Sequence, residues 1–255
     1  MSYELDTPLM KEMRRHRSIR RYKPDLLPAG MLEAIVSTAQ MASTSSYMQQ
    51  YSVVRVEEKE RKARLARLSG DQRQIHECPT FLVFCADLYR LKRVCEREGT
   101  QIQTDYAEAF LTAAVDVALL AQNVALAAES LGLGIVYIGG IRNHPAEVID
   151  ELALPDLVFP ITGMCLGYAA EQPAGKLRLP LPAVLHSEQY QLETVDAHLD
   201  AYEAEIIDLE MFRHMETGEV YGWMARAARR MAYSDPKSLR SAVGRVLRAQ
   251  GYGLK

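Results

Sequence analysis

The sequence has 255 residues, of which 48% are hydrophobic and 25% are charged, so it can bury a full hydrophobic core. Its 30 Lys and Arg residues nearly balance 33 Asp and Glu residues, and the net charge of -3 argues against nucleic acid or a membrane as partner. The four cysteines lack the spacing of a metal site, and Cys85 and Cys165 stand in apolar runs, which predicts core thiols in a reducing, cytoplasmic compartment.

The N-terminal 13 residues are polar and charged, unlike a secretory signal, and Thr7 or Pro8 is expected to begin a short helix. The segment 14–22 follows, with five arginines and one histidine in nine positions. Like charges this close repel one another unless something anionic lies among them. The segment is therefore either a phosphate site, in which guanidinium groups and a serine hydroxyl hold an oxyanion, or a solvated basic surface.

A second helix is predicted to begin at Pro28, with Leu32 and Ile35 on its apolar face. The hydroxyl residues 43–46 end this helix, because their side chains compete for backbone hydrogen bonds. The resulting loop offers hydroxyl and N–H groups to a phosphate or a polar ring edge. An ordinary connecting loop has the same composition, so the run alone does not decide between the two.

Residues 51–56 alternate and are rich in β-branched side chains, which predicts a strand. Residues 57–69 are expected to form a charged helix whose lysines and arginines, Lys62 among them, face solvent. Residues 80–86 are almost wholly apolar, as in a central strand that is buried on both faces. The polar stretch 87–99 carries no predicted element.

The longest helix is predicted over 101–131, about 45 Å at 1.5 Å per residue. Apolar residues surround most of its circumference, and Asp116, Gln122 and Asn123 interrupt the run, which indicates a buried helix rather than a membrane span. A second subunit is the simplest source of the extra cover. We therefore expect a homodimer built across this helix.

Beyond this helix, a strand is expected to end in Gly139-Gly140, where glycines allow a close backbone approach or a tight turn. No Gly-rich dinucleotide or nucleoside triphosphate motif is present, and no domain boundary is evident. The chain is thus expected to be one domain, 1–255, with 191–255 as a C-terminal helical extension and arm. The remaining predicted elements are a helix capped by Asn143 (145–152), a strand (160–168), an extended segment (172–182) and helices at 194–211 and 237–249.

Four motifs in this order resemble the nitroreductase superfamily, over about residues 13–190. They are His-Arg-Ser-Ile-Arg, the hydroxyl run with its following glutamine, Leu-Gly-Leu-Gly-x-Val-Tyr-Ile-Gly-Gly, and Lys-x-Arg-Leu-Pro. The sequence is most similar to the oxygen-insensitive NADPH nitroreductases and NADPH–flavin oxidoreductases. The resemblance implies an α+β, three-layer fold in which helices flank a mixed, mostly antiparallel sheet. It also implies a homodimer with a long central interface helix and swapped C-terminal arms.

The resemblance further implies FMN as cofactor. No catalytic side chain and no metal are expected, because flavin N5 accepts the hydride and the protein supplies binding and electrostatics. Arg20 would stabilise the negative charge of reduced flavin, and the Gly140 N–H would face N5. The implied FMN contacts are His16, Arg17, Ser18, Ile19, Arg20, Thr44, Ser45, Ser46, Gln49, Gln72, Tyr137, Ile138, Gly139, Gly140, Lys176 and Arg178.

The implied electron donor is NADPH or NADH, and the implied acceptor is a small molecule such as a nitroaromatic, a quinone or free flavin, reduced by a ping-pong mechanism. Substrate contacts would come from Ser46, Tyr47, Arg213 and Arg240. The acidic Glu216 and Glu219 lie where the family usually has basic residues for the 2′-phosphate of NADPH, which leaves the choice of coenzyme open. The alternatives are a flavin reductase that supplies a partner, and a flavin-binding regulatory protein without turnover.

Overall fold

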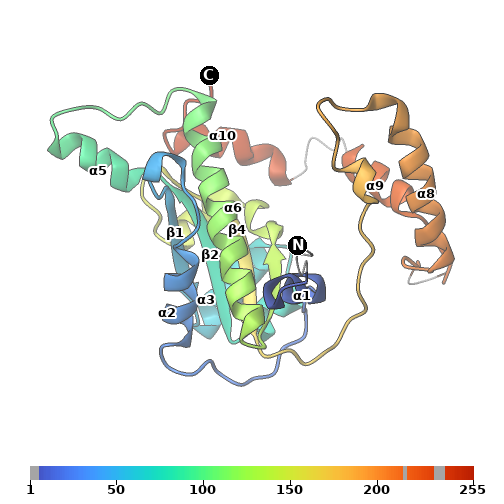
Figure 1. The fold of residues 1–255 in the computed structure, drawn as a ribbon. Helices are drawn as coiled ribbons and strands as arrows, with labels where there is room; N and C mark the ends of the chain where they lie inside the picture. Colours follow the sequence, from blue (N-terminus) through green and yellow to red (C-terminus); the bar gives the residue numbers. More distant parts are fainter. Residues whose placement is uncertain (1–5, 215–216, 233–238) are drawn as a thin grey trace. The chain divides into compact units, whose positions relative to one another are not determined.

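A computed structural model describes residues 6–214, 217–232 and 239–255. The chain forms two compact units, Met1–Pro173 with Leu239–Lys255, and Ala174–Ser238. The first unit holds the sheet and the longest helix, and the last residues of the chain return to it (Figure 1). The expectation of a single domain with an extension over 191–255 stays a prediction.

The sheet of the first unit has the strand order β1-β2-β4-β3, and each neighbouring pair is antiparallel. All eight residues of β2 are buried, which confirms the predicted central strand. An isolated parallel bridge between Ser18 and Ile135 adds the N-terminal segment to β3, so the sheet is mixed as predicted. The strands are β1 (Tyr51–Val56), β2 (Thr80–Asp87), β3 (Gly134–Ile138) and β4 (Val158–Gly167).

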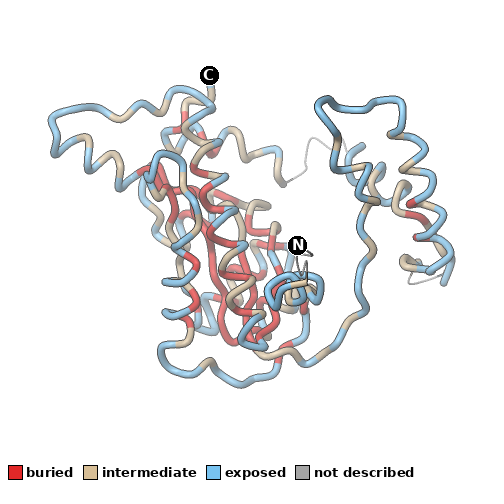
Figure 2. Tube along the Cα trace, in the orientation of Figure 1, coloured by how far each residue is buried: buried red, intermediate tan, exposed pale blue. Residues whose placement is uncertain are grey.

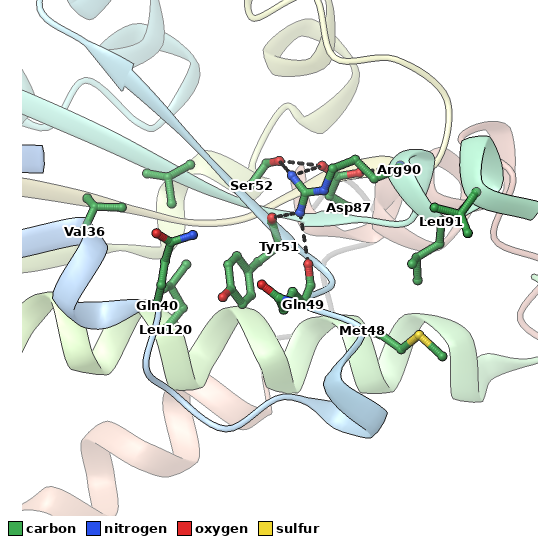
Figure 3. Close-up of a pocket in the computed structure, with 12 residues that line it drawn as sticks. Val36, Gln40, Met48, Gln49, Tyr51, Ser52, Asp87, Arg90, Leu91 and Leu120 are labelled. Atoms are coloured by element: carbon green, nitrogen blue, oxygen red, sulfur yellow. Dashed lines mark hydrogen bonds and ion pairs between the residues drawn. The ribbon is translucent and has the colours of Figure 1, made fainter.

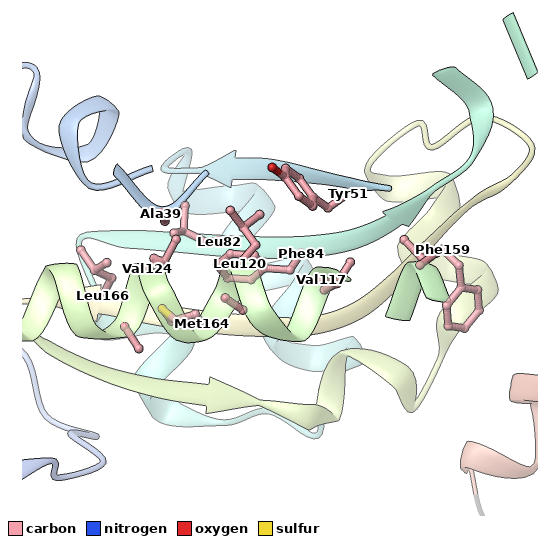
Figure 4. Close-up of a cluster of buried hydrophobic side chains, with 14 of the residues drawn as sticks. Ala39, Tyr51, Leu82, Phe84, Val117, Leu120, Val124, Phe159, Met164 and Leu166 are labelled. Carbon is pink, nitrogen blue, oxygen red and sulfur yellow. The ribbon is translucent and has the colours of Figure 1, made fainter. Parts of the chain in front are cut away.

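One face of the sheet is covered by α6 (Ala107–Ser130), about 36 Å long at 1.5 Å per residue. Its side chains Val117, Leu120 and Val124 belong to the same core cluster as Leu82 of β2 (Figure 4). Among the described residues, α6 is the one helix whose length and composition would suit a membrane span. In the structure its inner face instead packs on the sheet and on α2 (Met31–Ala39), as core helices of globular domains do.

The opposite face is covered by α3 (Lys59–Leu68), α4 (Arg73–Glu77) and α7 (Pro145–Glu151), whose buried side chains form a second core cluster. Helices on both faces of the sheet give the predicted three layers, and burial is concentrated on the strands and the helix faces against them (Figure 2). Cys85 and Cys165 are core residues as expected, and burial raises the pKa of the Cys85 thiol to about 12.

Further helices of the first unit are α1 (Pro8–Arg15), α5 (Tyr89–Arg97) and α10 (Val243–Ala249), and those of the second unit are α8 (Val195–Asp208) and α9 (Trp223–Met231). Short 3₁₀ turns lie at Ser45–Tyr47, Gly139–Arg142, Leu181–Ala183, Leu192–Thr194 and Leu239–Ala242. Helix α1 begins at Pro8 as predicted, and the Thr7 hydroxyl accepts a hydrogen bond from the Met10 N–H.

Several predicted boundaries were wrong. Helix α2 begins at Met31 rather than Pro28, because Gly30 at its N-cap takes a left-handed conformation with φ of 81°. Asn143 does not cap α7, since the N-cap residue is His144. Helix α6 begins at Ala107 rather than at residue 101, and the first two residues of the predicted helix 237–249 lie outside the described residues.

Three helices and one buried charge were missed, and the first of these helices is the short α4 between α3 and β2. Helix α5 lies in the supposedly irregular stretch 87–99, and α9 lies in the segment 212–234, for which no element was predicted. Lys62 does not face solvent: it is 7% exposed, and its ammonium donates to the main-chain carbonyl of Cys78. A carbonyl partner of this kind allows a lysine to be buried.

Candidate functional site

The basic segment is attached to the edge of the sheet. The Ile19 N–H donates to the Ile135 carbonyl of β3 at 2.8 Å, next to the Ser18 bridge. The buried Tyr22 hydroxyl donates to the Ile19 carbonyl at 2.7 Å and lies 3.2 Å from the Cys165 carbonyl of β4. Hydrogen bonds on both sides of Ser18 and Arg20 therefore fix the backbone from which these side chains extend.

The five arginines of this segment fall into two groups. Three have carboxylate partners: Arg14, Arg15 and Arg21 pair with Asp6, Glu12 and Glu77. The guanidinium groups of Arg17 and Arg20 donate only to nearby main-chain carbonyls, and no carboxylate of the described chain lies within 4.0 Å of either. Two cations without an internal counter-ion are thus held at the edge of the sheet, which favours the anion site over the solvated surface.

His16 is held by a residue that sequence reasoning did not single out. Its Nδ1 lies 2.6 Å from Oε1 of Glu129 near the end of α6, and the Glu129 side chain is 9% exposed. Burial raises the pKa of Glu129 and the nearby imidazole opposes that shift. Tyr137 lies in the same neighbourhood, where burial and the charge of Glu129 raise the pKa of its hydroxyl. The pairing fixes His16 beside the C-terminal part of α6.

The hydroxyl loop has a strained backbone. Ser46, Tyr47 and Gln49 have φ of 47°, 59° and 52°, which non-glycine residues rarely adopt. The carboxylate of Asp116 on α6 accepts the Ser45 N–H at 2.8 Å and the Gln50 N–H at 3.1 Å. At 1% exposure, Asp116 is almost wholly buried. It therefore holds both ends of the loop against α6.

The guanidinium of Arg90 also fixes the hydroxyl loop. Arg90 on α5 donates to the Gln49 carbonyl at 3.0 Å, to the Tyr51 carbonyl and to the Ser52 hydroxyl at 3.0 Å (Figure 3). The same guanidinium lies 3.3 Å from the Asp87 carboxylate. A cavity of about 520 Å³ adjoins these groups. Because these partners already engage the Arg90 guanidinium, we assign it the role of fixing the loop rather than of binding a ligand.

The double glycine lies beside two other predicted site residues. A Cβ on Gly140 would collide with the Ser69 carbonyl and with the Gln72 amide, so the close approach requires glycine. A Cβ on Gly139 would lie 3.4 Å from the guanidinium of Arg240. Gln72 itself donates to the Ser69 carbonyl at 2.9 Å. The structure thus brings Gln72, Gly139, Gly140 and Arg240 together.

Arg240 lies in a strongly basic neighbourhood. Its Nε donates to Oδ1 of Asn143 at 3.2 Å, which places it on the 3₁₀ turn that follows β3. Burial and the charge of Arg240 lower the pKa of the adjacent Arg142, whose guanidinium donates to the Ile161 carbonyl. Two guanidinium groups therefore lie close together at the glycine end of β3.

The other predicted residues do not all belong to this group. Lys176, Arg178 and Arg213 lie in the second unit, where the Arg213 guanidinium pairs with Glu210 and donates to the Gly218 carbonyl. Their approach to the cofactor stays a prediction. Ile19 and Ile138 are buried in the core, so any contact they make with a cofactor comes through the main chain. Glu216 lies outside the described residues.

Comparison with known proteins gives consistent matches. A sequence model of the nitroreductase family matches residues 13–168, and one of the nitroreductase family C-terminal domain matches residues 176–255. The chain is 43% identical to an FMN reductase (NADPH) of Bacillus subtilis, over 76% of this chain and 79% of that enzyme. It is 40% identical to an oxygen-insensitive NADPH nitroreductase of Salmonella typhimurium, over 72% and 75%. The structure of NfrA2 from B. megaterium superposes with a TM-score of 0.92 at 33% identity, covering 98% of this chain and all of that one.

Proposed function

Since the chain belongs to the nitroreductase family, we propose that it is an FMN-dependent oxidoreductase that takes electrons from NAD(P)H and passes them to nitroaromatics, quinones or free flavin. The relatives named FMN reductase (NADPH) and NADPH nitroreductase support both the cofactor and the reaction. The observation that carries the proposal is the pair Arg17 and Arg20 beside β3, whose guanidinium groups have no carboxylate partner in the described chain, while Glu171 accepts the Arg20 main-chain N–H.

The residues of the first unit fit the chemistry of FMN. Arg17, Ser18 and His16 offer cationic and hydroxyl donors to a phosphate, as expected of a phosphate site. Gly140 is buried, and its lack of a side chain lets the main chain lie against Ser69 and the Gln72 amide. Bound FMN supplies the two-electron chemistry, and the protein contributes binding and charge stabilisation. Arg20 is the residue that we assign to the negative charge of the reduced isoalloxazine ring, and the contribution of Lys176 and Arg178 to the phosphate site stays a prediction.

The position of the hydroxyl loop supports a dimeric site. Asp116 holds the loop and Glu129 holds His16, and these two residues of α6 are 129 − 116 = 13 positions apart. That separation is about 20 Å along a helix. Within one chain the loop and the basic segment therefore lie toward opposite ends of α6. We propose that a second copy, packed across α6, brings its Thr44, Ser45 and Ser46 to the basic segment of the first.

The exposed face of α6 supports the same arrangement. Leu111, Val115 and Leu119 recur every four residues on one side of the helix and are 57%, 48% and 42% exposed. On the adjacent α1, Leu9 and Met13 are also at least half exposed. An apolar surface of this kind on a single chain marks an interface. We therefore propose a homodimer. The four free cysteines of the chain suit a reducing compartment, which supports a cytoplasmic protein, whereas residues 239–255 pack on their own first unit and give no support to swapped arms.

Replacing Val115 by lysine is expected to convert the dimer to a monomer, because it places a charge at the centre of the proposed interface. Analytical ultracentrifugation at low protein concentration measures the change. The matched control is Glu108→Lys, which changes an exposed residue in the first turn of the same helix. The homodimer is contradicted if the unmodified protein sediments as a folded monomer.

The activity is tested on the purified protein. We expect it to be yellow with bound FMN and, when loaded, to oxidise NADPH or NADH with parallel-line kinetics toward a nitroaromatic or quinone acceptor. Steady-state rates with each coenzyme establish the donor. If the flavin-loaded protein binds FMN but oxidises neither coenzyme, a flavin-binding regulatory role replaces the enzyme. If neither FMN binding nor oxidation is found, the proposed function is wrong.

A further inference from the structure

Glu129 stands where a carboxylate is unfavourable for folding. It is the last residue but one of α6, so its charge faces the negative end of the helix dipole. The side chain is only 9% exposed, and burial raises the pKa of its carboxyl. Its Oε2 atom is buried and has no hydrogen-bond partner in the described part of the chain. Because these features lower stability, we expect Glu129 to serve the site rather than the fold.

The counter-charge of this carboxylate is His16. The Nδ1 atom of the ring lies 2.6 Å from Oε1 of Glu129, and no lysine or arginine among the described residues comes within 4.0 Å of the same carboxylate. The other ring nitrogen, Nε2, has no hydrogen-bond partner in the part of the chain that the structure describes, and the side chain is 30% exposed. One nitrogen is therefore held, and the other is available to a ligand.

The helices around the pair favour a positive charge on the ring. His16 is the C-cap residue of α1, and α1 lies beside the C-terminal part of α6 (Figure 1). The C-terminal ends of two helices thus meet at the pair, and each end carries a partial negative charge. After burial, the charge of Glu12 on α1 is a further influence that raises the pKa of Glu129. A proton on the pair is favoured by all of these charges.

The other charged and titratable groups nearby are engaged elsewhere. The Arg17 guanidinium donates to the main-chain carbonyl of His16 at 2.8 Å, and Arg15 pairs with Glu12 at 3.9 Å. On β3, burial and then the charge of Glu129 raise the pKa of the Tyr137 hydroxyl, which therefore stays neutral. Within the described chain, the charge of Glu129 is thus balanced by His16.

The contact with Glu129 determines how His16 can bind a ligand. A histidine that gives Nδ1 to a carboxylate has Nε2 left for its second partner. With a phosphate oxygen at Nε2, the ring lies between two anionic acceptors, and it can donate to both only as an imidazolium. A neutral ring would place a lone pair against one of the anions. The arrangement therefore suits a phosphate monoester better than an uncharged ligand.

We propose that Glu129 is a positioning residue for the cofactor phosphate, which holds the His16 imidazolium so that its Nε2–H donates to a phosphate oxygen. The proposal rests on the proposed function, in which His16 belongs to the phosphate site for FMN. Glu129 does not touch the flavin and acts through His16. It thereby contributes to the preference of the site for FMN over riboflavin, which has the same ring system but no phosphate.

The first test compares the two flavins. Glu129→Gln keeps the size and hydrogen-bonding capacity of the side chain but removes its charge. The Kd for FMN should rise about tenfold, because a charge-assisted hydrogen bond becomes a neutral one, and the Kd for riboflavin should change by less than about twofold. The melting temperature of the apoprotein should be unchanged or higher, because a buried carboxylate is removed. Quenching of flavin fluorescence measures both affinities.

The matched control is Glu12→Gln. This variant removes the same charge beside the pair, but the Glu12 carboxylate lies toward Arg15 and not toward His16. Its Kd for FMN should change by less than about twofold, as expected for a long surface ion pair. An equal loss of FMN affinity in both variants would assign the effect to the general field of the acids and overturn the positioning role.

The second test reads the protonation of His16 by NMR of protein with isotope-labelled histidine. With FMN bound at about pH 8, where a phosphate monoester carries two negative charges, both ring nitrogens of His16 should carry a proton. In Glu129→Gln, one nitrogen should be unprotonated, because the amide does not stabilise the cation. The variant His16→Gln identifies the signals of this ring among those of the six histidines.

The outcomes separate this proposal from the proposed function. Unchanged FMN affinity in Glu129→Gln, an equal loss for FMN and riboflavin, or a neutral His16 ring in the FMN-loaded unmodified protein would each overturn the role of Glu129. If the unmodified protein binds neither flavin, the proposed function fails. NMR with inorganic phosphate as the probe then decides the role of Glu129. Phosphate should protonate both nitrogens of His16 in the unmodified protein but not in Glu129→Gln, and the same response in both would overturn the proposal.

Discussion

Replacing Arg20 by alanine is expected to weaken FMN binding by about 10- to 100-fold, since hydrogen bonds from charged groups contribute about 1.5–3 kcal/mol each. The remaining flavin should also be reduced more slowly, because the cation that stabilises the negative ring is missing. The structure supports a large effect: the Arg20 guanidinium donates to the Ser18 carbonyl and has no carboxylate partner among the described residues. Quenching of flavin fluorescence measures the Kd, and stopped-flow absorbance measures the reduction rate.

The control for Arg20 is its neighbour. Arg21→Ala removes the same charge from the same segment, but the Arg21 guanidinium lies 3.9 Å from Glu77 and is about half exposed. A long surface ion pair of this kind contributes little, so FMN affinity should change by less than about threefold. Equal behaviour of the two variants, or unchanged binding and reduction in Arg20→Ala, would show that the segment does not hold the flavin.

Replacing Asp116 by alanine is expected to lower the free energy of unfolding by about 3 kcal/mol, because two main-chain N–H groups lose their acceptor. One of them belongs to Gln50, which is itself buried. Without Asp116 the hydroxyl loop should also leave its left-handed conformation, which costs energy at Ser46, Tyr47 and Gln49. FMN affinity should therefore fall as well. Thermal unfolding at fixed protein and FMN concentrations measures the loss of stability. Quenching of flavin fluorescence measures the loss of FMN affinity.

Two variants define what Asp116 does. Asp116→Asn keeps one oxygen acceptor and should recover part of the stability, whereas Glu108→Ala changes an exposed acid on the same helix and should be neutral within about 0.5 kcal/mol. Unchanged melting temperature and FMN affinity in Asp116→Ala would refute the role of this carboxylate in holding the loop. Loss of stability with normal FMN affinity would restrict the role to folding.

Much of the secondary structure of the first unit can be predicted from the pattern of apolar residues in its sequence. The run from Thr80 to Ala86 has the composition of a strand buried on both faces, and the alanine-rich helix follows from its length and its stop at Gly132. Helices α5 and α9 could be missed because charged residues interrupt their apolar ones, at five of nine positions in α5 and three of nine in α9, and neither helix has a buried residue. Only one narrow stripe of apolar residues marks such a helix, and the average polarity of the segment does not reveal that stripe.

The sequence motifs of the candidate site could be predicted, but the residues that hold those motifs in place could not. His16 to Arg20 and Gly139-Gly140 stand out by charge and by glycine content. Asp116 and Glu129 were visible only as polar residues in an apolar helix, and nothing local indicated that each holds a segment distant in sequence. Long-range hydrogen bonds of this kind depend on the tertiary fold.

The bridge between Ser18 and Ile135 also matters for solubility. Strand β3 lies at the edge of the sheet, and edge strands expose main-chain groups that can pair with other chains and start aggregation. Pairing of the basic segment with β3 occupies part of this edge, and its arginines add like charges that repel another strand. The residues assigned to the cofactor thus also protect the edge, so shortening the chain from its N-terminus past Ser18 would expose a pairing surface for aggregation.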